Sequence, residues 1–258
     1  MKKVLMISLL TLSMFAVQTG FAQNGTTNVH LFQSFLYDAP IAATPYVEGG
    51  LNYDSYDGAS SIFIGAQGGY GLNEKIEIGA RLGYQSWSFD GADGQSGITD
   101  ITAVGRYNLV NSASPTKISA GAMITLPIGS EDIMQGNMHF GGFGALRHKL
   151  ESGMELTANL GLILLEMTTF EFNQQTLQVE EKTSRESSFA IGAGVIYPLK
   201  DKMSIVGEFR TQSEVEYTAL SCGINYQMGK GCVRGALVLG LSDGAPDIAI
   251  IGGYLVTL

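Results

Sequence analysis

The chain is poor in proline, in charged side chains and in long apolar runs, and each shortage excludes a class of protein. Proline is rarely found inside a β-sheet, so with only 6 prolines in 258 residues most segments are able to form strands. Beyond residue 22, no stretch approaches the roughly 18 consecutive apolar residues of a membrane-spanning helix, which excludes a helical membrane protein. The net charge of -9 argues against a nucleic acid partner. The two cysteines fall on opposite faces of their predicted strands, so no disulfide is expected.

Residues 1–22 have the pattern of a secretory signal peptide. Two lysines precede an apolar stretch from Val4 to about Val17, and small residues follow it. We expect cleavage after Ala22 and export of the chain. The next segment, residues 23–44, is expected either to lie in the periplasm or to fold back into the domain that follows.

Residues 45–258 consist of short segments in which apolar and polar residues alternate, with turn-forming residues between them. A period of two predicts β-strands, and no stretch shows a helical period. The twelve predicted strands are residues 46–56, 61–72, 75–87, 100–110, 117–128, 138–150, 154–167, 187–199, 203–215, 219–228, 232–241 and 247–258. Short turns alternate with longer loops, among them residues 90–97 and 173–186. This alternation is typical of an up-and-down barrel in an outer membrane.

The alternation of faces fits two kinds of barrel. A soluble barrel places its apolar face inside, whereas a membrane barrel places it outside against lipid. The signal peptide, the scarcity of proline, the strand length and the loop pattern favour the second. We predict an all-β fold: a single up-and-down antiparallel transmembrane β-barrel of about twelve strands, in the bacterial outer membrane. Its lipid and lipopolysaccharide would then be partners, and closure would satisfy every backbone polar group.

The last predicted strand carries a pattern of its own. Gly253, Val256 and Leu258 resemble the C-terminal signal that the outer-membrane assembly machinery recognises. An aromatic residue is usual at the last position, where this chain has Leu258. We therefore expect this machinery to be a partner.

Three further motifs resemble one family. They are Gly97 with Asp100 at a strand opening, Leu126 to Gly129 at a strand end, and the closing loop Asp243 to Asp247. They are similar to motifs of the outer-membrane barrel family named for the MetA pathway of phenol degradation. The resemblance implies an outer-membrane barrel with a transport role, and it leaves the substrate unnamed.

Charged side chains gather on the face opposite the apolar one. The candidates for the lining of the lumen are Glu48, Glu77, Arg81, Arg106, Glu208, Arg210 and Arg234. Charges of both signs on one face are expected to pair, because an unpaired charge beside a low-dielectric wall is costly. They either line an open polar passage or fill a plugged lumen, and the sequence leaves both interpretations open.

The sequence favours a passive channel or transporter for small molecules, including hydrophobic or aromatic ones by the family resemblance. The alternative is a structural or adhesive surface barrel that conducts nothing. An outer-membrane acyl-hydrolase is a third interpretation, because His139 lies close in sequence to Ser130 and Glu131. We expect no enzyme. Residues 90–94 lack the ligand spacing of a calcium loop, so no metal and no cofactor is expected.

Overall fold

The computed structural model describes residues 29–258 except 43, 111–113, 134–135, 174–177 and 201, and it describes no side chains in 168–182. The predicted signal peptide lies outside the described residues. Among the residues that are described, no helix is long and apolar enough to cross a membrane.

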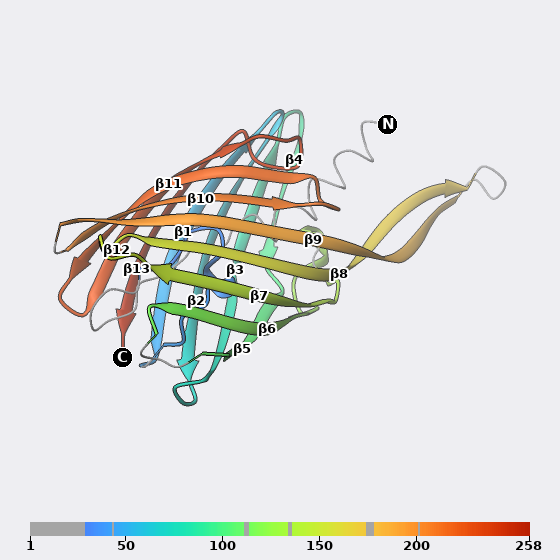
Figure 1. Cartoon of the computed structure of the whole chain (residues 1–258). Helices are drawn as coiled ribbons and strands as arrows, with labels where there is room; N and C mark the ends of the chain where they lie inside the picture. Colours follow the sequence, from blue (N-terminus) through green and yellow to red (C-terminus); the bar gives the residue numbers. More distant parts are fainter. Residues whose placement is uncertain (1–28, 43, 111–113, 134–135, 174–177, 201) are drawn as a thin grey trace.

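Thirteen strands form one antiparallel sheet that closes on itself (Figure 1). The elements are η1 (Phe35–Tyr37), β1 (Tyr46–Tyr56), β2 (Ala59–Gly71), β3 (Ile76–Phe89), β4 (Ala92–Ile98), β5 (Ile101–Asn108), β6 (Thr116–Leu126), η2 (Glu131–Ile133), β7 (His139–Lys149), β8 (Glu155–Asn173), β9 (Gln178–Lys200), β10 (Met203–Gln212), β11 (Tyr217–Met228), β12 (Gly231–Gly240) and β13 (Ile248–Thr257). Strands adjacent along the chain pair with each other except β4 and β5, which both pair with β3, and β1 pairs with β13 to close the barrel. The predicted all-β antiparallel barrel is confirmed.

The extra strand arises because two short strands, β4 and β5, share one edge of β3. β5 pairs with the first half of β3, and β4 pairs with the second half. The predicted loop 90–97 is therefore wrong, because most of it is the strand β4. At the break, the carboxylate of Asp100 accepts the N–H groups of Gly129 at 2.6 Å and Gly136 at 2.9 Å. A backbone that leaves the ladder needs such partners, and an alternation pattern does not reveal them.

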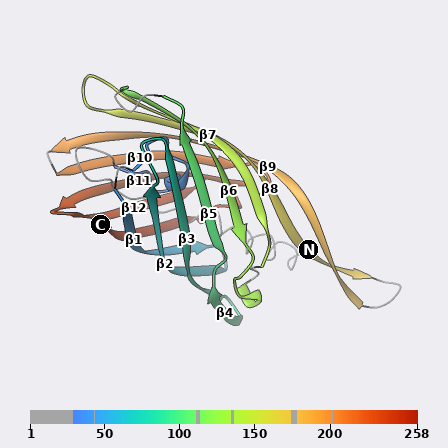
Figure 2. The ribbon, with the colours of Figure 1, turned by 90° about the horizontal axis from the view of Figure 1, so that it is seen from below.

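The second predicted long loop, residues 173–186, is also largely strand. β8 and β9 remain paired as far as Asn173 and Gln178, so they form a hairpin that extends beyond the rest of the barrel (Figures 1 and 2). Strand pairing there does not need an apolar face, because water can contact both sides of the hairpin.

Apolar side chains cover the outside of the barrel, and polar ones lie within. In β1, Val47 is 41% exposed, whereas its neighbour Glu48 is 1% exposed. The same alternation repeats in β10, where Glu208 and Arg210 are buried. This is the inverse of a soluble barrel, and it is the arrangement of a barrel that is surrounded by lipid.

Residues 29–42 occupy the interior. This segment, here called the plug, carries η1 and leads into β1, and the strands surround it in both views of the ribbon (Figures 1 and 2). Its residues from His30 to Ala39 are all buried. Leu31, Phe32, Phe35, Leu36 and Tyr37 belong to the main apolar cluster of the fold.

Candidate functional site

The seven residues that the sequence proposes for the lumen all point inward. Glu48, Glu77, Arg81, Arg106, Glu208, Arg210 and Arg234 are each at most 8% exposed. Five of them, described below, contact the plug directly. Whether they ever line a passage stays a prediction.

Glu208, on β10, holds one turn of the plug by its backbone. Its carboxylate accepts the N–H groups of Phe32, of Gln33 at 3.0 Å and of Ser34 at 3.2 Å. Consecutive N–H groups that converge on one anion form a concave site of positive partial charge. Hydrogen bonds to an ionised acceptor are among the strong ones, and each typically contributes about 1.5–3 kcal/mol.

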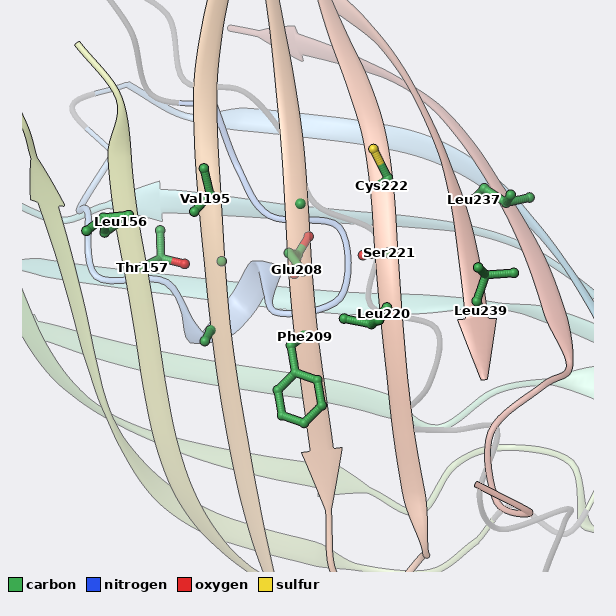
Figure 3. Close-up of a pocket in the computed structure, with 13 residues that line it drawn as sticks. Leu156, Thr157, Val195, Glu208, Phe209, Leu220, Ser221, Cys222, Leu237 and Leu239 are labelled. Carbon is green, nitrogen blue, oxygen red and sulfur yellow. The ribbon is translucent and has the colours of Figure 1, made fainter. Parts of the chain in front are cut away.

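The outer surface of the wall is hollowed near Glu208. Leu156, Phe209 and Leu220 surround a hollow of about 720 Å³ on the outer face, and the N-terminal segment passes behind these strands (Figure 3). A side chain added at the neighbouring Gly207 would meet nothing within 4 Å. Hydrocarbon outside and packed plug inside leave Glu208 in surroundings of low dielectric, where its hydrogen bonds are stronger than in water.

Arg210 lies two residues beyond Glu208 on the same face and binds the same plug residue. Its Nη1 donates to the carbonyl oxygen of Gln33 at 2.6 Å. The side chain of Gln33 is held as well, because Tyr217 donates to its Oε1 and its Nε2 donates to Ser221, both at 2.8 Å. Gln33 is therefore fixed through its main chain and its side chain.

Arg234, on β12, binds the start of the plug. Its Nη2 donates to the carbonyl oxygen of His30 at 2.7 Å, and its Nε donates to Asn225. The guanidinium lies 4.3 Å from the centre of the Phe32 ring, a cation–π arrangement. Glu48 lies 3.7 Å from its Nη1 and supplies the opposite charge.

Arg147 was not among the residues proposed from the sequence, yet it binds three partners in the lumen. It donates to Glu155 at 2.5 Å, to the carboxylate of Asp38 at 3.0 Å and to the carbonyl oxygen of Val29 at 2.5 Å. Parity could have revealed it, because Arg147 shares its face of β7 with Phe143.

Glu77 and Arg106 form an ion pair beneath the end of the plug. Arg106 also donates to the carbonyl oxygen of Asp38 at 2.7 Å. Glu77 accepts the N–H of Ala42 at 2.5 Å and the hydroxyl of Tyr46 at 2.8 Å. The pair thus fixes both the plug and its entry into β1.

Arg81 lies apart from these contacts. Its guanidinium stacks over the ring of Phe63 at 4.5 Å. Nearby in the wall, Asp54 accepts hydrogen bonds from Asn52 at 2.7 Å and from Ser61 at 3.0 Å.

The imidazole of His30 is enclosed in the plug without a hydrogen bond. Neither ring nitrogen has such a partner within the described part of the chain, and Nδ1 lies 4.0 Å from the carboxylate of Asp38. Burial, assisted by the positive charges of Arg234, Arg147 and Arg106, holds the pKa of His30 well below its usual value. The imidazole is therefore neutral while the plug is in place.

The residues of the proposed assembly signal lie on the strand that closes the barrel. Gly253 faces inward, and a side chain there would collide with the carboxylate of Glu48. Val256 pairs with Val47 of β1, and Leu258 is exposed. Their recognition by assembly machinery stays a prediction.

The hydrogen bonds of His139 and Ser130 lead to different strands. His139 is buried and its Nδ1 accepts the N–H of Glu166 on β8, whereas the Ser130 hydroxyl accepts the N–H of Ile98 on β4. His139 is the first residue of β7, and its side chain faces inward. Both cysteines are free, Cys222 on the outer face and Cys232 inside. Among the described residues, no group of three or more His, Cys, Asp or Glu side chains could hold a metal ion.

No family model matches the chain, and no curated protein does. Solved structures of similar fold include the COG4313 outer membrane channel from Pseudomonas putida F1, at 12% identity over 86% of this chain and 98% of that chain, with a TM-score of 0.63. The toluene transporter TbuX of Ralstonia pickettii has 11% identity over 93% and 99%, with a TM-score of 0.53. A mutant of TodX, a monoaromatic hydrocarbon channel, has 8% identity over 94% and 98%, with a TM-score of 0.52. At these identities the chain shares their barrel fold.

Proposed function

We propose that this protein is a passive channel of the bacterial outer membrane, and that the plug closes its lumen until it moves. The observation that carries this proposal is the backbone contact between Glu208 and the plug. Hydrogen bonds and ion pairs hold the plug, and both cysteines of the chain are free. The closed state is therefore reversible without any covalent step.

The substrate class that we propose is small hydrophobic or aromatic molecules. Two proteins of similar fold are a toluene transporter and a monoaromatic hydrocarbon channel by their names. The wall itself carries inward-facing aromatic rings, among them Phe143, which Tyr37 of the plug contacts at 4.8 Å, and the pair of Tyr56 with Trp87 at 5.7 Å between ring centres. Such rings would attract apolar solutes once the plug has moved.

The remaining partners follow from the location. An apolar outer surface requires lipid, and we propose outer-membrane lipid and lipopolysaccharide as its surroundings. We propose that the assembly machinery recognises β13 through Gly253, Val256 and Leu258. We further propose that the protein catalyses no reaction, since five of its seven proposed lumen residues contact the plug.

A non-conducting structural barrel is the second candidate. It is favoured by the tight packing of the plug, in which Phe32 and Phe35 are 0% exposed. The two candidates differ in what happens when the plug is loosened.

Planar-bilayer conductance of the full chain with Glu208→Gln separates them. The amide retains the shape of the carboxylate and removes its charge, so the plug should detach more often and the open fraction should rise at least tenfold. Glu166→Gln is the matched control, because Glu166 pairs with the exposed Arg185 at 3.1 Å. A folded Glu208→Gln protein that never conducts would favour the structural barrel.

A further inference from the structure

The wall of the lumen binds the plug largely through main-chain groups. Carboxylates accept its N–H groups, and guanidinium groups donate to its carbonyl oxygens. The N–H contacts are those of Phe32, Gln33 and Ser34 with Glu208 and of Ala42 with Glu77, and the carbonyl contacts are those of Val29 with Arg147, His30 with Arg234, Gln33 with Arg210 and Asp38 with Arg106. Every peptide carries these groups, whatever its sequence.

The wall also provides recesses for the apolar side chains of the plug. Gly223 leaves the space in which the ring of Phe32 lies, because any side chain at this position would collide with that ring. A side chain at Gly79 would lie 3.3 Å from Leu36, and one at Gly194 would lie 3.2 Å from Leu31. Glycine at these positions allows another part of the chain to approach closely.

One position of the wall takes a carboxylate. Arg147 contacts the carboxylate of Asp38 at 3.0 Å and a carbonyl oxygen through a second nitrogen. The site as a whole therefore accepts an extended chain with alternating donors and acceptors, aromatic side chains and one negative group.

We propose that this surface is a binding site for peptides, and that a short aromatic peptide with one carboxylate takes the place of the plug when the plug leaves. The inference rests on the proposed function, since it requires a plug that can leave. A hydrocarbon would satisfy neither Glu208 nor Arg210, and leaving such groups in a closed lumen without partners is costly. A simple anion would pair with Arg210, but the Glu208 carboxylate would repel it. A peptide satisfies both, as Gln33 does.

A free peptide competes poorly with a tethered plug, because the tether gives the plug an effective concentration in the millimolar range. The plug must therefore be weakened without change to the wall. Gln33→Pro does this in the full chain, because proline lacks the N–H that Glu208 accepts.

The probe is a fluorescently labelled synthetic peptide with the sequence of residues 29–42, VHLFQSFLYDAPIA. Fluorescence anisotropy should show that it binds the detergent-solubilised Gln33→Pro protein at least tenfold more tightly than the unaltered chain. A second peptide, N-methylated at the residues corresponding to Phe32, Gln33 and Ser34, keeps every side chain but lacks the N–H groups. Its affinity should be at least tenfold lower.

Equal binding of the methylated and unmethylated peptides, or no binding of either to the folded Gln33→Pro protein, would overturn the peptide site. Adding Glu208→Gln to the Gln33→Pro protein should abolish the difference between the two peptides. Conductance of the Gln33→Pro protein, recorded before the peptide is added, distinguishes the two proposals. Current without peptide binding would refute the peptide site and leave the channel, whereas peptide binding without current would refute the channel and leave the peptide site.

Discussion

Glu208 and Arg210 lie two residues apart on the inner face of β10, and they bind the N–H and the carbonyl oxygen of one and the same plug residue. The N–H of Gln33 lies 3.0 Å from the Glu208 carboxylate, and the Gln33 carbonyl lies 2.6 Å from Arg210. A strand presents every second side chain to the same face, so this pair matches the donor and acceptor of a single residue. We expect the closed state to depend on this pair and on the groups around it.

Arg210→Ala should loosen the plug and change the ion preference of the open state. The variant removes a charge-assisted hydrogen bond to Gln33 and one positive charge from the inner face of β10. The open fraction should rise about tenfold, and selectivity should shift towards cations, since fixed charges bias the ions that enter. Reversal potentials in a salt gradient measure the shift. An unchanged reversal potential in the open state would show that Arg210 does not face the conducting path.

Gly223→Ala should displace the plug while the wall remains closed. The added methyl group would occupy the space of the Phe32 ring, and it would also press on Ala236 and on the carbonyl oxygen of Gly235 in the next strand, so the wall must shift slightly to admit it. Its matched control is Gly207→Ala on the neighbouring strand, where a methyl group meets nothing within 4 Å. Protease should cleave the plug of Gly223→Ala faster than that of Gly207→Ala, and both proteins should keep the heat-modifiable band of a folded barrel. Equal cleavage rates would contradict the assigned position of Phe32.

Acidification should weaken the hold on the plug. The pKa of His30 in place lies well below its usual value of 6.5, so the released plug binds a proton that the docked plug does not. The docked state therefore loses stability as the pH falls below about 6.5, and the loss ends once the docked imidazole also protonates. The groups that face His30 are Asp38, Arg234, Arg147 and Arg106, with the rings of Phe35 and Tyr46.

Open fraction against pH tests this dependence, with His30→Gln as the comparison. The variant cannot take up a proton, so its profile between pH 5 and 7 should be flatter. If the two profiles coincide, carboxylates of the wall carry the pH dependence and His30 does not.

Val256→Asp should impair assembly more than it lowers the stability of the finished barrel. Val256 is partly buried near the end of β13 and pairs with Val47. A charge near the membrane interface costs only about 1 kcal/mol or less, because the penalty falls away from the bilayer midplane. The yield of folded protein in cells should drop several-fold, while urea unfolding of the surviving fraction changes little. A normal yield would argue against recognition of this strand.

The wall of this protein could be predicted from sequence because one physical constraint repeats in every strand. Lipid outside and polar groups inside impose a period of two, and that period places Glu208 and Arg210 inward without any structural knowledge. The same rule also reaches Arg147. The split of one wall position into β4 and β5 could not be predicted, since it depends on contacts of Asp100 with a loop about 30 residues away.

The sequence leaves the position of the plug, in the periplasm or in the lumen, open for a related reason. Residues 29–42 have no period, because their contacts are spread over several strands of the surrounding wall. Phe32 contacts Arg234 and Gln33 contacts Tyr217, partners roughly 200 residues distant along the chain. Alternation places charged side chains on the inner face, but it does not show which backbone groups they bind. Whether such a segment lies inside or outside the barrel depends on that binding.

The role of the plug is tested most directly by single-channel conductance of the chain with and without residues 29–42. Both proteins must first show the heat-modifiable band of a folded barrel. The complete chain should remain closed apart from rare openings, and the shortened chain should carry a steady ion current. Equal currents, or a folded shortened barrel that carries none, would contradict a lumen that is closed by its own N-terminal segment.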